Sequence, residues 1–167
     1  MIIPFTLNGE KTVIDIPGTK RVIDVLRENF GLQKTKASCY QGACGNCSIL
    51  LDGHIVSSCT LPAFELKDRT VLTAEGYMKT EEYRRIDRAF NENSYYPCDF
   101  CRWGKIFAIH EFINSEENSS TESLTQALKG NQCNCTSPSL LLSIAEQIIK
   151  NERGTNPRPE YEHISRK

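Results

Sequence analysis

The chain has 167 residues, of which 39% are hydrophobic and 25% are charged, and its formal net charge is −1. Scattered basic residues in a nearly neutral chain argue against nucleic acid or an anionic membrane surface as a partner. The sequence has no apolar run near 18 residues, and its first residues lack the basic and long apolar segments of a signal peptide. We therefore expect a cytoplasmic protein of one or two small domains without a transmembrane helix.

Strand signals dominate the first 75 or so residues. The dipeptides Asn8-Gly9 and Asp52-Gly53 favour tight β-hairpins, because asparagine, aspartate and glycine tolerate the positive φ angles of such turns. Each dipeptide lies between two segments of strand-like composition. Five strands are predicted, at residues 2–7, 11–16, 47–51, 54–58 and 70–73.

One helix is expected between the two hairpins, over residues 19–30. Its apolar residues recur at the spacing of a helix face, at Val22, Ile23, Leu26 and Phe30. Thr19 is a possible N-cap, and Gly31 stands where a glycine commonly follows the last helical turn. The helix should therefore pack one face on the predicted sheet.

A loop with three closely spaced cysteines follows this helix. Cys39, Cys44 and Cys47 have C-x4-C-x2-C spacing, and Cys59 comes after the second hairpin. This is the ligand spacing of a plant-type 2Fe–2S centre. The two glycines between the cysteines would let the loop curl around two irons with its amides toward the sulfurs. We predict these four cysteines as ligands of a first 2Fe–2S cluster.

From Tyr77 onward, helical signals replace strand signals. Four helices are predicted, over residues 80–93, over residues 103–113, from a capping box at Ser119 and Glu122 to Gly130, and from Ser137-Pro138 onward. Residues 151–167 are polar and aperiodic, which is typical of a tail without its own fold. The predicted division is residues 1–77, residues 78–150 and the tail.

The helical half carries a second set of four cysteines, Cys98, Cys101, Cys133 and Cys135, spaced as C-x2-C and C-x-C. Both pairs lie near predicted helix N-termini, where the backbone field favours thiolates. Four thiolates suit tetrahedral zinc as well as an iron–sulfur cluster, although C-x-C is an unusual zinc spacing. A disulfide framework is less favoured, because such frameworks are typical of smaller secreted domains.

In combination and order, these motifs resemble the small iron–sulfur subunit of the molybdenum hydroxylases, which include xanthine dehydrogenases, aldehyde oxidoreductases and carbon monoxide dehydrogenases of the molybdenum type. The resemblance runs from about Phe5 to Ile149. It is carried by Leu26-Arg27-Glu28, the Cys39 loop, Asp52 to Cys59, Thr73 to Gly76, Cys98 to Cys101, and Gly130 to Thr136. It implies an α+β chain with a β-grasp, plant-type ferredoxin-like domain followed by an all-α four-helix domain.

The resemblance also implies an electron path. The cluster of the first cysteine set would lie nearer a flavin, and the cluster of Cys98, Cys101, Cys133 and Cys135 nearer a molybdopterin. This chain would then be the electron-transfer subunit of a molybdenum-dependent oxidoreductase, with no substrate chemistry of its own. Molybdopterin and FAD would lie on a large and a medium partner subunit. The alternative is a ferredoxin-like domain fused to a zinc-clamped helical interaction or redox-sensing module.

Three residues around the second cysteine set depart from the family pattern. The family usually has Gln-Cys-Gly-Phe-Cys and Cys-Arg-Cys, where this chain has Pro97 and Asp99 in the first motif and Asn134 in the second. A glutamine that generally touches the pterin is thus replaced by proline. Asp99 adds a negative charge and Asn134 removes a cation, while Arg102 could compensate. These changes predict a second cluster with a lower reduction potential than is usual for the family.

Overall fold

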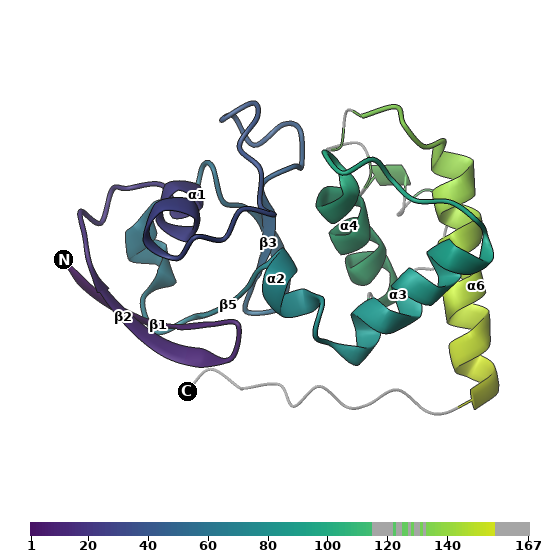
Figure 1. The fold of residues 1–167 in the computed structure, drawn as a ribbon, viewed down its shortest axis with the longest axis horizontal. Helices are drawn as coiled ribbons and strands as arrows, with labels where there is room; N and C mark the ends of the chain where they lie inside the picture. The colour runs from purple at the N-terminus through teal and green to yellow at the C-terminus, as the bar shows by residue number, and fades with distance from the viewer. Residues whose placement is uncertain (115–121, 123–124, 127, 129–130, 132, 156–167) are drawn as a thin grey trace.

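The computed structural model describes residues 1–114, 122, 125–126, 128, 131 and 133–155. A β-sheet comes first in the chain and a group of helices second, and the two parts lie side by side (Figure 1). Ser119 of the predicted capping box and most of the helix predicted to follow it lie outside the described residues. None of the described helices is long and apolar enough to cross a membrane.

The sheet has five strands in the order β2-β1-β5-β3-β4. β1 is parallel to β5, and every other neighbouring pair is antiparallel. The strands are β1 (Ile2–Leu7), β2 (Glu10–Asp15), β3 (Ser48–Leu51), β4 (His54–Ser57) and β5 (Thr70–Leu72). All five predicted strands are confirmed, with bounds that differ by at most one residue. Both predicted hairpins form, with positive φ at Asn8 and Gly9 and at Asp52 and Gly53.

The helix predicted over residues 19–30 begins later than expected. It consists of α1 (Val22–Asp24), which continues into a π-helical turn, η1 (Val25–Asn29). The prediction of Thr19 as the N-cap is wrong, because Arg21 holds that position with an extended backbone. The extended backbone follows from pairing with a distant segment: the Val22 amide donates to the Leu61 carbonyl at 2.9 Å, and Arg21 forms a β-bridge with Pro62. Gly31 follows the helix with a φ of 66°, as predicted.

The helices whose bounds lie within the described part of the second half are α2 (Ala74–Tyr77), α3 (Glu81–Glu92), α4 (Arg102–Asn114) and α6 (Pro138–Thr155). Thr80 caps α3 by accepting a hydrogen bond from the Tyr83 amide at 3.1 Å. Ser137 accepts one from the Leu140 amide at 3.3 Å, and Pro138 is the first residue of α6, as predicted. α6 continues to Thr155, past the residue at which the tail is predicted to begin. Two short elements are not predicted, α2 and a 3-10 turn, η2 (Ala63–Leu66).

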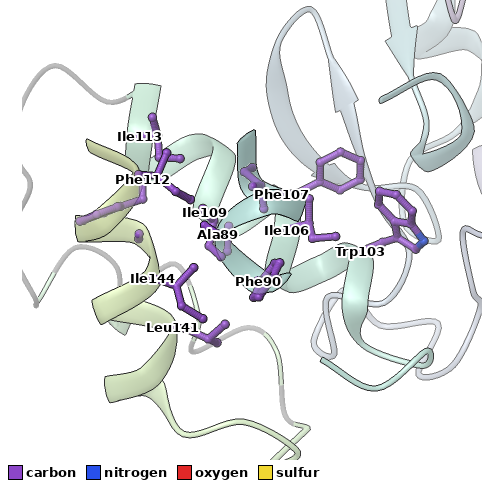
Figure 2. Packing of buried hydrophobic residues seen from close by; sticks show 14 of the residues in the cluster. Ala89, Phe90, Trp103, Ile106, Phe107, Ile109, Phe112, Ile113, Leu141 and Ile144 are labelled. Carbon is purple, nitrogen blue, oxygen red and sulfur yellow. The ribbon is translucent and has the colours of Figure 1, made fainter. Parts of the chain in front are cut away.

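β3 joins two hydrophobic cores. Leu50 is buried in the core of the helical half, whereas its neighbours Ile49 and Leu51 are buried in the core between the sheet and α1/η1. Because alternate residues of a strand point to opposite faces, this one strand is covered on both sides. Side chains of α3, α4 and α6 meet in the first of these cores (Figure 2). The sheet thereby fixes the position of the helices next to the cysteine loop.

Trp103 belongs to the core of the helical half. Its side chain is buried and stacks on the Tyr83 ring, with 5.6 Å between ring centroids. Phe107, one turn further along α4, is also buried and lies 6.1 Å from the indole (Figure 2). Trp103 therefore contributes to the packing between α3 and α4.

Candidate metal centres

The β3–β4 hairpin brings Cys47 and Cys59 together. Cys47 immediately precedes β3 and Cys59 lies two residues after β4, and both are 1% exposed. The Ser58 amide and hydroxyl both donate to the Cys47 carbonyl, at 3.2 and 2.6 Å. The hairpin therefore places the fourth cysteine of the set next to the end of the cysteine loop, although twelve positions separate the two residues in the chain.

The loop from Cys39 to Cys47 curls as the glycine pattern predicts. Gly42 and Gly45 have φ angles of 72° and 71°, which residues with a Cβ rarely adopt. The Gln41 amide donates to the Cys39 sulfur at 3.4 Å. This amide, together with the Cys44 thiol and amide, lowers the pKa of Cys39 to about 6, whereas burial raises the pKa of Cys47 to about 11. The loop thus directs backbone donors at a sulfur, as ligation by a thiolate requires.

The second set of cysteines gathers at the starts of two helices. Cys101 directly precedes α4, and Cys135 lies three residues before α6. The sulfur of Cys98 is 3.5 Å from that of Cys101 and 3.7 Å from that of Cys133, and Cys101 and Cys135 are 3.2 Å apart. All four sulfurs lie within 4.8 Å of one another, and no other such cluster of His, Cys, Asp or Glu is found among the described residues.

Hydrogen bonds in this second set favour a thiolate at Cys135. Burial acts to raise its pKa, but hydrogen bonds from the Thr136 hydroxyl, the Cys98 amide and neighbouring thiols lower the pKa of Cys135 to about 5. At Cys101, by contrast, burial raises the pKa. The Tyr95 hydroxyl donates to the Cys135 carbonyl at 2.7 Å and contacts the Thr136 hydroxyl. Tyr95 therefore fixes the loop that carries Cys135.

Lys105 is a residue of this site that the sequence analysis missed. Its side chain is 2% exposed, and its ammonium group donates to the Cys133 carbonyl at 2.9 Å and to the Cys135 sulfur at 3.4 Å. The available signal was its position in α4, four residues after Cys101 and within an otherwise apolar stretch. Residues four apart share a helix face, so a lysine at this spacing was placed to reach the cysteine set.

The donor chemistry of the second set fits a metal centre. Four thiols and a buried cation provide negative ligands and a compensating charge. A tetrahedral zinc site would place its sulfurs about 3.8 Å apart, since Zn–S bonds are about 2.3 Å long. The sulfur separations of this set are close to those of such a zinc site. As a donor type, thiolates are equally the ligands of 2Fe–2S clusters. The donor set therefore fits either group.

The two cysteine sets are joined by a close backbone contact. A Cβ added at Gly104 would lie 2.5 Å from the Gly45 carbonyl oxygen and 2.7 Å from the Asn131 side-chain nitrogen. Asn131 in turn donates to the Cys101 carbonyl at 3.3 Å and accepts from the Cys133 amide at 3.3 Å. Glycine at position 104 thus lets α4 approach the first cysteine loop directly.

Among the positions that depart from the family pattern, Asp99 lies at the surface. The Asp99 side chain is 81% exposed and pairs with Arg102 at 2.7 Å, which is the compensation that the sequence suggests. The Pro97 carbonyl accepts from the Arg102 side chain at 3.4 Å. The charge at Asp99 therefore faces solvent, whereas that of Lys105 is enclosed.

Comparisons with known proteins agree with the cysteine pattern. Residues 5–74 match the protein family described as "2Fe-2S iron-sulfur cluster binding domain", and residues 73–144 match the "[2Fe-2S] binding domain" family. The nicotinate dehydrogenase small FeS subunit of Eubacterium barkeri is 32% identical over 134 residues, which are 80% of this chain and 85% of that protein. A probable xanthine dehydrogenase subunit of Bacillus subtilis (strain 168) is 34% identical over 131 residues, 78% of this chain and 75% of that protein.

A solved structure extends the similarity to the fold. A chain of quinoline 2-oxidoreductase from Pseudomonas putida 86 superposes with a TM-score of 0.77 at 29% sequence identity. The superposition covers 93% of this chain and 97% of that one. The overall fold is thus shared along nearly the whole length of both chains.

Proposed function

We propose that this chain, which belongs to the small iron–sulfur subunits of the molybdenum hydroxylases, carries electrons through two 2Fe–2S clusters. As a member of that family it is part of an oxidoreductase. Cys39, Cys44, Cys47 and Cys59 hold the first cluster, and the second is held by Cys98, Cys101, Cys133 and Cys135. When bound, each cluster supplies a centre that accepts and releases one electron.

The observation that carries this proposal is the presence of two separate four-cysteine sets, one within each segment that matches a 2Fe–2S family. The match supports a β-grasp domain for the first segment and a four-helix domain for the second, with a boundary after residue 77. The contact of Gly104 with Gly45 supports transfer between the clusters, because it joins the two sets through backbone rather than through a layer of side chains.

The chain's own residues hold and enclose the two centres. Amides of the first loop stabilise a thiolate at Cys39, and Lys105 and Thr136 do so at Cys135. Leu50 and the buried side chains of α4 keep water from the space between the sheet and the helices. These contacts hold both centres in one fixed arrangement, which suits a relay rather than a mobile carrier.

Family membership supports two partner subunits. The chain lies between a molybdopterin-binding large subunit, where substrate is oxidised, and an FAD-binding medium subunit. Cys98, Cys101, Cys133 and Cys135 would hold the cluster that receives electrons from the molybdopterin side, and Cys39, Cys44, Cys47 and Cys59 the cluster that passes them on toward FAD. The names of the relatives, which describe a small FeS subunit and a subunit of a xanthine dehydrogenase, support assembly with further subunits.

A metal and sulfide count tests the proposal. The full chain, purified without oxygen, should contain four iron and four acid-labile sulfide per molecule, because two 2Fe–2S clusters need that many. The zinc-clamped alternative instead requires two iron, two sulfide and one zinc. It is not favoured, because residues 73–144 match an iron–sulfur family. A measured zinc equivalent with half the iron would contradict the proposed function.

A further inference from the structure

Lys105 is a buried cation that donates a hydrogen bond to the sulfur of Cys135. It lies in α4 between Gly104 and Ile106, and both the lysine and its apolar neighbours Ile106 and Phe107 are nearly inaccessible to solvent. Its ammonium group reaches the loop that carries Cys133 and Cys135, where it binds a carbonyl oxygen and a sulfur. It is thus fixed at the second cysteine set, not extended toward water.

No carboxylate among the described residues compensates this charge within salt-bridge distance. The nearby Asp99 pairs with Arg102 at the surface instead. A buried ammonium group without an anionic partner is strongly unfavourable. Within the described part of the chain, the anionic groups that the Lys105 ammonium group faces are the cysteine sulfurs. Its charge is therefore compensated by thiolates and by the metal group that they bind.

We propose that Lys105 is a positioning residue that raises the reduction potential of the second cluster. This inference depends on the proposed function, because it needs a 2Fe–2S cluster at the second cysteine set. The reduced cluster carries one more negative charge than the oxidised one. A fixed cation in a poorly screened site therefore stabilises the reduced form more. The hydrogen bond to the Cys135 sulfur acts in the same direction.

A raised potential of the second cluster is the opposite of what the neighbouring sequence predicts. Asp99 and Asn134 alone predict a low potential, since one adds a negative charge and the other stands in place of a cation. Asp99 is exposed and paired with Arg102, so solvent screens it. Lys105 approaches the same sulfurs from within the helical core and supplies the cation that position 134 lacks. The buried charge therefore dominates the balance.

Two variants and one control test the proposal in the full chain with its clusters in place. Lys105→Met removes the charge and the hydrogen bonds, and Lys105→Gln removes the charge but keeps a donor. Lys36→Met is the control, because the Lys36 ammonium group donates to the Asp99 carbonyl at 2.9 Å rather than to a sulfur. The measurement is an EPR-monitored redox titration that follows both clusters separately.

Both Lys105 variants should make reduction of the second cluster at least tenfold less favourable, a fall of about 59 mV for one electron. The first cluster should be unaffected, and Lys36→Met should shift the second cluster by less. An unchanged potential in Lys105→Met and Lys105→Gln would overturn the proposal. Equal shifts in Lys105→Met and Lys36→Met would also overturn it.

If the variants lose the second cluster, a measurement on the unsubstituted chain tests the contact between the Lys105 ammonium group and that cluster. Protein labelled with ¹⁵N only at the lysine side-chain nitrogen should show a weak ¹⁵N hyperfine coupling to the reduced second cluster in pulsed EPR. The absence of this coupling would overturn the contact on which the inference depends. Failure of the proposed function is distinct, because an unsubstituted chain with two iron and zinc would have no second cluster signal at all.

Discussion

At the scale of single residues, burial decides which charges act on the second cysteine set. Asp99 and Lys105 are both close to it in sequence, but the first is 81% exposed and the second 2% exposed. Exposed charges are screened by water and salt, and exposed ion pairs contribute little. Lys105, which is enclosed and bound to the Cys135 sulfur, is screened much less. The sequence shows both residues but not this difference in depth.

Asp99→Asn should therefore raise the potential of the second cluster by less than Lys105→Met lowers it. The substitution removes a negative charge, so the sign is upward, but the charge faces solvent and already pairs with Arg102. Redox titration of the two variants under the same salt conditions makes the comparison. A rise from Asp99→Asn that equals or exceeds the fall from Lys105→Met would contradict the argument from burial.

At the scale of elements, the predictable parts are those that local chemistry determines. Alternating residues and the Asn8-Gly9 and Asp52-Gly53 dipeptides suffice for the strands and hairpins, which need only their own neighbours. The start of α1 was not predictable, because residues 61–63 hold the backbone before Val22 in extended form. α2 and η2 span four residues each, too few for a periodic pattern.

The same limit applies to the candidate site. Its two cysteine sets are visible as spacing. For Lys105 the sequence offers only its place four residues after Cys101 in an apolar stretch, and the packing of α4 is needed to show that it is buried. The requirement for glycine at position 104 is not visible in the sequence either, because Gly45, with which a side chain there would clash, lies in a loop distant in sequence. Long-range contacts such as these follow from how the helices dock on β3.

Gly104→Ala should destabilise the chain, although alanine is the better helix former. Helix propensity alone predicts a gain of about 0.5–1 kcal/mol in the free energy of unfolding. The added Cβ would lie 2.5 Å from the Gly45 carbonyl oxygen, a backbone atom that yields less readily than the end of a flexible side chain. Overpacking of this kind costs about 1–3 kcal/mol, so a net loss is expected.

Denaturant unfolding of both proteins, with their iron–sulfur clusters bound, measures this difference in the free energy of unfolding. The sign of the difference is enough to decide. A more stable Gly104→Ala variant would show that α4 does not approach the cysteine loop as closely as the 2.5 Å separation requires. A less stable variant with an altered magnetic interaction between the two reduced clusters would show that the contact also sets their spacing.

At the scale of the whole molecule, the sheet and the helices form one support for the two cysteine sets. β3 packs against the helical core through Leu50 and against α1/η1 through Ile49 and Leu51. The same strand follows directly on Cys47, and α4 follows directly on Cys101. The elements that hold one cysteine set therefore also position the other, as the proposed transfer between two clusters requires.

The most direct test of this arrangement is EPR spin quantitation of the fully reduced chain and of Cys44→Ala and Cys133→Ala. The unsubstituted chain should show two distinct signals of one spin each. Cys44→Ala should lose one signal and Cys133→Ala the other, because each cysteine is assigned to a different cluster. Loss of the same signal in both variants, or retention of both signals in either one, would contradict the assignment of two separate four-cysteine clusters.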